Sequence, residues 1–148
     1  MEQNYKKLLT NQYFCILSKI NDMIQIKTFY FNDLRECCYV LYDESKECVI
    51  VDPGMQNSNE EGRLVKFIEE NGLKPVKLLN THGHFDHIWG SNKLRDLSGV
   101  QVFAFEDEKD VCESSKLNVS ADAGRPYEAR VDWYLKDGEN VNPLEVLE

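Results

Sequence analysis

All three histidines of this chain fall within seven consecutive positions, residues 81–87, whose sequence is T-H-G-H-F-D-H. Imidazole and carboxylate groups are the ligands that zinc-type divalent metals prefer, and a catalytic site leaves one position open for water. His82 and His84 are two positions apart, so both side chains leave extended backbone on the same side and can reach one ion. Asp86 and His87 follow where the chain turns toward a helix. The spacing predicts a metal site at these four residues.

The elements around this cluster must place it at an edge of a sheet. Alternating apolar residues and turn signals predict strands at six places: 23–31, 37–42, 47–51, 76–79, 100–105 and 131–135. Helical periodicity predicts three helices, over 58–71, 88–97 and 106–114, the first with Ser58 and Glu61 at capping-box spacing. An antiparallel opening followed by strand–helix alternation predicts an α/β fold, a mixed sheet with helices on one face.

Composition bounds the partners and the compartment. A net charge of -9 and a pI near 4.9 disfavour binding to nucleic acid or anionic membranes. The apolar run at residues 13–17 is too short for a signal-peptide core or a bilayer span, and five cysteines without a C-x-x-C pair indicate reduced thiols. We therefore expect a cytoplasmic protein with a small-molecule substrate, in which residues 1–22 are an N-terminal extension and residues 23–148 form the domain.

Two motifs carry a resemblance to a known family. Residues 81–87 resemble the H-x-H-x-D-H signature of the metallo-β-lactamase superfamily, and the following W-G at 89–90 continues as in many members. The sequence V-D-P-G at residues 51–54 resembles the earlier motif of the same family, which lies after two strands and before a helix. The likeness covers roughly residues 24–148 and is greatest to the glyoxalase II-like hydrolases, which cleave hydroxyacylglutathione thioesters.

The resemblance implies a ligand set and a mechanism. In it, His82 and His84 would bind a first metal, and Asp86 and His87 a second, with zinc expected and iron or manganese accepted by the same ligands. Asp86 would also lie near the attacking water, which makes it the candidate catalytic residue. Metal-activated water would then attack a thioester or other ester or amide carbonyl. Asp52 would be either a buried residue that supports the ligands or a turn aspartate that bonds its own backbone.

The resemblance also implies that this chain supplies only half of the family's αββα sandwich. Family members continue into a second half that adds a histidine in a G-H-T-P-G-like segment, a bridging aspartate and a final histidine. The domain at 23–148 would then be incomplete at its C-terminus, and each metal would keep two protein ligands. Two functions follow as expectations: a truncated metal-dependent hydrolase, or a non-catalytic fragment with weak or no metal binding that forms a homodimer through its uncovered sheet face. A nuclease of the same superfamily is disfavoured by the acidic charge.

Overall fold

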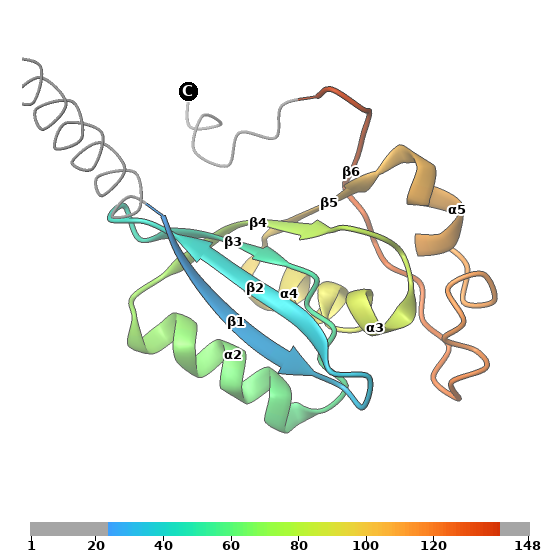
Figure 1. Ribbon diagram of the computed structural model, residues 1–148, viewed down its shortest axis with the longest axis horizontal. Helices are drawn as coiled ribbons and strands as arrows, with labels where there is room; N and C mark the ends of the chain where they lie inside the picture. Colours follow the sequence, from blue (N-terminus) through green and yellow to red (C-terminus); the bar gives the residue numbers. More distant parts are fainter. Residues whose placement is uncertain (1–23, 140–148) are drawn as a thin grey trace, which may run out of the picture.

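The computed structural model describes residues 24–139, which form one six-stranded mixed sheet (Figure 1). The strands lie side by side in sequence order: β1 (Gln25–Phe31), β2 (Glu36–Tyr42), β3 (Glu47–Val51), β4 (Lys74–Asn80), β5 (Gln101–Phe105) and β6 (Trp133–Leu135). The first three strands pair antiparallel, and β3 to β6 pair parallel. The expected mixed sheet is confirmed. The expected extension at 1–22 lies outside the described residues, as do residues 140–148 of the expected domain.

Helices follow β3, β4 and β5, and those that follow β3 and β4 pack on one face of the sheet, as the alternation predicts (Figure 1). They are α2 (Ser58–Glu70), α3 (Phe85–Ile88), α4 (Ser91–Ser98), the 3-10 turn η1 (Glu106–Glu108) and α5 (Lys109–Cys112). The core beneath the sheet joins alternate strand residues such as Val40, Ile50 and Leu78 to Leu64 of α2 and Leu94 of α4. Within residues 24–139, no helix has the length and apolar character needed to cross a membrane.

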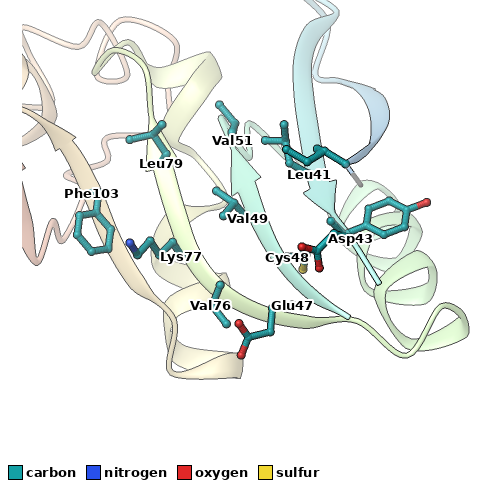
Figure 2. A pocket seen from close by; sticks show the side chains of 12 residues that line it. Leu41, Asp43, Glu47, Cys48, Val49, Val51, Val76, Lys77, Leu79 and Phe103 are labelled. Atoms are coloured by element: carbon teal, nitrogen blue, oxygen red, sulfur yellow. The ribbon is translucent and has the colours of Figure 1, made fainter. Parts of the chain in front are cut away.

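The opposite face of the sheet is apolar, and no described helix lies over it (Figure 1). Five half-buried side chains line a shallow hollow of about 200 Å³ on this face: Leu41, Val49, Val51, Leu79 and Phe103 (Figure 2). They alternate along the strands with the buried residues of the helix-covered face, because neighbouring strand residues point to opposite sides. Residues 24–139 therefore form a sheet with one covered face and one open apolar face, as expected for part of the larger sandwich.

The start of α2 differs from the sequence expectation. The capping residue is Asn57, whose side chain accepts hydrogen bonds from the backbone N–H groups of Asn59 and Glu60 at 3.1 and 3.0 Å. The predicted capping box of Ser58 and Glu61 is therefore wrong. Asparagine is as good a capping residue as serine. Because Asn57 precedes Ser58, the helix begins one residue earlier than a Ser58 cap would allow.

The expected helix at 88–97 is instead two helices, α3 and α4, which meet at Gly90. The Gly90 N–H donates to the carbonyl oxygen of Pro53 at 2.7 Å, and a Cβ at this position would lie 2.5 Å from the same oxygen. The close approach to the loop after β3 thus requires glycine and interrupts the helix. The third expected helix, at 106–114, is shorter than predicted and opens with the 3-10 turn η1.

Candidate metal centre

Asp52 and residues 81–87 lie together because β3 and β4 are parallel neighbours. Val51 pairs with Leu79, so both strands end at the same edge of the sheet. The Asp52 N–H donates to the Leu79 carbonyl at 2.9 Å, and the chain then turns with Asp52 at a φ of 50°. This left-handed conformation is tolerated better by aspartate and asparagine than by most residues. Both motifs therefore meet at the carboxyl ends of parallel strands, where open α/β sheets bind ligands.

The buried Asp52 side chain joins the two motifs. Its carboxylate accepts hydrogen bonds from the Thr81 backbone N–H, at 2.7 Å, and from the Thr81 hydroxyl. Its Oδ2 atom also lies 3.0 Å from Nδ1 of His87. These bonds go to the histidine segment and none goes to the turn that Asp52 begins. Of the two interpretations that the sequence left open, the structure supports a buried residue that holds the candidate ligands.

The four predicted ligands converge beside Asp52. The ring of His82 lies against that of His87, with 3.7 Å between centroids, and its centroid is 5.3 Å from that of His84. Oδ2 of Asp86 lies 3.4 Å from Nε2 of His87. His84 is exposed and the other three side chains are half-buried, so the cluster is open to solvent on one side. A catalytic metal needs such an opening for water or substrate.

Three donor atoms lie at metal-binding separations from one another. They belong to Asp52, His82 and His87, and each is within 4.8 Å of the other two. Small rotations of these side chains would bring each atom to the roughly 2.0–2.2 Å from one ion that zinc requires of nitrogen and oxygen ligands. The sequence did not place Asp52 among the ligands. The division of His82 and His84 from Asp86 and His87 between two metals stays a prediction, because this geometry does not test it.

The electrostatics of the cluster favours the forms that bind metal. Burial, followed by the neighbouring His87, lowers the pKa of His82, so its imidazole is neutral with a lone pair to donate. A carboxylate only accepts hydrogen bonds, so the contact of His87 with Asp52 needs the proton on Nδ1. This leaves Nε2 as the ligand atom, on the side of Asp86. Carboxylates commonly fix metal-binding histidines in this way. The donor set therefore fits a divalent metal.

Gly83 lets a neighbouring helix support the histidine segment. A Cβ on Gly83 would lie 2.7 Å from the backbone nitrogen of Cys112 in α5. The Gly83 N–H donates to Oε2 of Glu108, in η1, at 2.9 Å. The absence of a side chain on Gly83 leaves space that the backbone of α5 occupies. The segment is therefore held by α5 and η1 as well as by Asp52.

Asn32, from the turn between β1 and β2, also reaches the cluster and was not expected from the sequence. It is buried, and its side-chain amide donates to the carbonyl oxygens of Gly54 at 3.0 Å and Asp86 at 2.9 Å. Asn32 thereby ties the loop after β3 to the backbone of a candidate ligand. No sequence pattern marks it, because asparagine is common in turns for its own backbone preferences.

Glu36, the first residue of β2, is the second unexpected neighbour. Its side chain is fully buried, and Oε1 lies 3.7 Å from Nδ1 of His87. Burial, followed by the charges of Asp52 and Asp86, raises the pKa of Glu36 to about 9. A signal was present in the sequence, since Glu36 alternates with Cys38 on the face of β2 that should be apolar. A carboxyl group in such a position indicates either an error of register or a functional constraint.

A second hollow, of about 630 Å³, opens beside Thr81 at the ends of the parallel strands. Its lining comes from β5, η1 and the chain around β6: Thr81, Phe105, Glu106, Asp107, Glu108, Leu135, Lys136 and Asp137. The volume lies within the range of small-molecule sites. Because Thr81 lines the hollow and also bonds Asp52, a molecule bound in the hollow would lie near the candidate metal.

The parallel strand ends, the two motifs and the clustered donors define a metal-binding domain of the metallo-β-lactamase type. A model of the metallo-beta-lactamase superfamily matches residues 34–147, which is more than half of the chain. The chain therefore belongs to this superfamily, a family of metallo-hydrolases whose members bind metal ions. The family expected from the H-x-H-x-D-H and V-D-P-G motifs is confirmed.

Individual relatives show what the chain is similar to. It is 38% identical over 76 residues to the hydroxyacylglutathione hydrolase GloC of Haemophilus influenzae, covering 51% of this chain and 34% of that protein. It is 34% identical over 104 residues to the mitochondrial persulfide dioxygenase ETHE1 of Bos taurus, covering 70% of this chain and 33% of that protein. The chain thus spans about a third of the length of the curated relatives it matches.

Solved structures share the fold. The B3 metallo-beta-lactamase BLEG-1 superposes with a TM-score of 0.68 at 31% identity, covering 76% of this chain and 54% of that one. A di-iron-bound form of TTHA1623 superposes with a TM-score of 0.63 at 22% identity, covering 78% of this chain and 56% of that one. The six strands and their helices therefore correspond to about half of the larger fold.

Proposed function

We propose that this protein is a metal-dependent hydrolase in which activated water attacks a thioester or another ester or amide carbonyl. The observation that carries the proposal is that the candidate ligands His82 and His87 and the supporting Asp52 have donor atoms within 4.8 Å of one another, at the ends of parallel strands. Membership of a metallo-hydrolase family supports it, and the similarity to a hydroxyacylglutathione hydrolase favours a thioester.

The cluster would hold a divalent metal, either zinc or the iron or manganese that the same ligands accept, and such an ion would lower the pKa of a bound water and polarise a carbonyl oxygen. His82, His84, Asp86 and His87 are the proposed ligands, in two pairs. Asp52 holds His87 from behind through its contact with Nδ1. The lowered pKa of His82 keeps its ring in the neutral form that donates to a metal.

Asp86 is the proposed catalytic residue. Its carboxylate lies 3.4 Å from Nε2 of His87 and is half-buried at the mouth of the cluster. An oxygen in that position can accept a hydrogen bond from the attacking water and direct its lone pair toward a carbonyl carbon. The backbone carbonyl of Asp86 is fixed by Asn32, so the side chain projects from a held segment.

The proposed substrate is a small molecule that enters through the hollow beside Thr81. This hollow adjoins the cluster and offers about 630 Å³. Its acidic lining and the net charge of -9 argue against nucleic acid and against anionic membranes as partners. A cytoplasmic location is part of the same proposal and follows from the sequence.

The test measures metal content and thioester cleavage on the same purified protein. The chain is loaded in turn with Zn²⁺, Fe²⁺ and Mn²⁺, and an S-acylglutathione is followed by loss of its thioester absorbance. Wild type should retain metal and cleave the thioester, and His82→Ala or His84→Ala should lower both by at least about 100-fold, more than is typical for residues that only support ligands. Lys93→Ala, an exposed change on α4, should leave both unchanged. Metal content unaffected by either histidine substitution would overturn the proposal.

The alternative proposal is a non-catalytic domain that associates through the open sheet face. The apolar hollow lined by Val49, Leu79 and Phe103 favours it, since exposed apolar patches mark interaction surfaces. Sedimentation velocity should then show a dimer, and Leu79→Glu should convert it to a monomer. The wild-type protein should have no thioesterase activity. A monomer at all concentrations would exclude this alternative.

A further inference from the structure

The open apolar face of the sheet lies beside the point where the chain enters β1. Ile24, which directly precedes β1, lines the apolar hollow together with Val49 and Leu79 (Figure 2). Ile24 is 51% exposed, and Ile26, two positions further along, is 62% exposed. Ile26 pairs with Leu41 of β2, another residue of the hollow. The segment that precedes Ile24 is therefore attached to the sheet at the rim of this hollow.

The sequence of that segment carries an apolar pattern of helical period. Between residues 5 and 20, apolar side chains recur three or four positions apart, and most of the residues between them are polar. This spacing is typical of an amphipathic helix with one apolar stripe. The stripe consists of Tyr5, Leu8, Leu9, Tyr13, Ile16, Leu17 and Ile20. A helix with such a stripe gains most of its stability by burying the stripe against another apolar surface.

The length and the charge of the segment fit the open face. A helix over residues 5–20 would be about 24 Å long, and the distance across the sheet from β1 to β5 is about 19 Å, since neighbouring strands lie about 4.8 Å apart. Helices that bind anionic membranes are rich in lysine and arginine. Here the positive and negative charges nearly balance, which favours a protein surface over a membrane. The charged residues of the segment are Glu2, Lys6, Lys7, Lys19 and Asp22.

We propose that residues 5–20 form an amphipathic helix whose apolar stripe packs on the open face and covers the hollow lined by Val49, Leu79 and Phe103. Because residues 21–23 are the whole connection to Ile24, the effective concentration of the helix at this face is of roughly millimolar order. The helix therefore competes well with a second copy of the chain for the same surface. The sheet then carries helices of its own chain on both faces, a common layer arrangement for a mostly parallel sheet. The inference does not depend on metal binding or on hydrolysis.

The test measures contacts between the stripe and the open face by NMR on the full chain with ¹³C-labelled methyl groups. Nuclear Overhauser effects are expected from the methyl groups of Ile16 and Ile20 to those of Val49 and Leu79. A mixture of labelled and unlabelled protein separates contacts within one molecule from contacts between two copies, and contacts within one molecule support the proposal. Contacts found between copies alone would assign the face to a second copy. That result would overturn the proposal, and so would the absence of any contact between the stripe and the face.

Ile16→Glu and Ser18→Glu are a matched pair of variants. Both add a carboxylate to the segment, but Ser18 lies about 160° around a helix from Ile16 and outside the stripe. Ile16→Glu should abolish the Overhauser effects at Val49 and Leu79 and raise the fluorescence of ANS, a dye that binds exposed apolar surface. Ser18→Glu should change neither, and unaltered amide shifts of α2, on the covered face, would show that both variants remain folded. Equal changes in the two variants, or none in Ile16→Glu, would overturn the proposal.

Discussion

Two carboxyl groups at opposite edges of the sheet differ in what surrounds them. Asp132, just before β6, accepts two hydrogen bonds from the Arg95 guanidinium, at 3.1 and 2.6 Å, and one from the Val102 N–H at 2.8 Å. The bond from Arg95 holds the pKa of Asp132 below its usual range. Glu36 lies at the other edge, where the strands end beside the candidate ligands (the metal edge). It is fully buried, no charged donor among residues 24–139 lies within hydrogen-bond distance of it, and burial raises the pKa of Glu36 to about 9.

The difference separates a carboxyl group that stabilises the fold from one that is held for another purpose. Asp132 ties α4 to β5 and β6, and the chain supplies every donor that its carboxylate needs. Glu36 is enclosed by other acidic groups, and its one ion-pair contact in the described residues is a candidate metal ligand. Costly local arrangements that the rest of the structure maintains are typical of functional sites. The presence or absence of charged hydrogen-bond donors thus distinguishes Asp132, which stabilises the fold, from Glu36, which lies beside the candidate ligands.

The largest effect is expected from Gly54→Ala, which crowds the metal edge. The added Cβ would lie 1.6 Å from the backbone oxygen of Asp86, so the loop after β3 must move. Overpacking of a rigid site costs about 1–3 kcal/mol and more where backbone is displaced, and we expect a loss of at least about 3 kcal/mol in the free energy of unfolding. Urea denaturation measures it, and Zn²⁺ affinity should fall in the same variant.

Gly62→Ala is the matched control for that substitution. Gly62 lies on the exposed side of α2, and nothing lies within 4 Å of an added Cβ. Alanine is a better helix former than glycine, so stability should rise by about 0.5–1 kcal/mol. A loss in Gly62→Ala as large as that in Gly54→Ala would show that crowding at the metal edge is not the cause.

A smaller loss is expected when the donors of Asn32 are removed. Asn32→Gly keeps the backbone at its φ of 51° but deletes the side-chain bonds to Gly54 and Asp86. Each bond contributes about 1 kcal/mol, so unfolding should become easier by about 2 kcal/mol. Lys46→Gly, an exposed change at a φ of 68°, controls for the flexibility that glycine adds to the unfolded chain. Equal losses in the two variants would remove the role assigned to the Asn32 side chain.

The sequence predicted those parts of the fold and site that local pattern determines. Alternation located the six strands, because each alternate residue must reach the core. The spacing of His82, His84, Asp86 and His87 located the candidate site, because residues so close in sequence stay close in space. Asn57 was missed as the cap of α2 because Ser58 and Glu61 also have capping-box spacing, and the choice depends on which backbone turn forms.

What the sequence did not predict depends on contacts between distant segments. Asn32 and Glu36 join the cluster only because the β1–β2 turn folds over the loop after β3. The interruption of the second helix at Gly90 follows from its contact with Pro53, which lies in a different connection. The candidate metal ligands are thus predicted from one motif, whereas the residues that contact them from a distance in sequence, such as Asn32 and Glu36, come from the turn between β1 and β2 and from β2.

The smallest change in stability is expected from Asp132→Asn, at the edge of the sheet away from the candidate ligands. This substitution removes a charge whose carboxylate already accepts hydrogen bonds from Arg95 and Val102. Exchange of the carboxylate for an amide should cost about 1 kcal/mol at pH 7, because the contact with Arg95 is partly open to solvent. The pKa of Asp132 is lower in the folded protein than in the unfolded chain, where it is about 3.9. Its contribution is therefore complete above that value and is lost as the pH falls through the lowered pKa.

Urea denaturation of wild type and Asp132→Asn should accordingly give a difference that is largest at pH 7 and shrinks at about pH 3, below the unfolded-state pKa. Asp96→Asn is the control, since Asp96 makes a similar bond to Arg130 at 2.6 Å but is largely exposed. Solvent screens that pair, so its removal should have little effect on stability at either pH. A difference for Asp132→Asn that stays constant with pH would mean that packing of the side chain, and not its charge, holds α4 against β5 and β6.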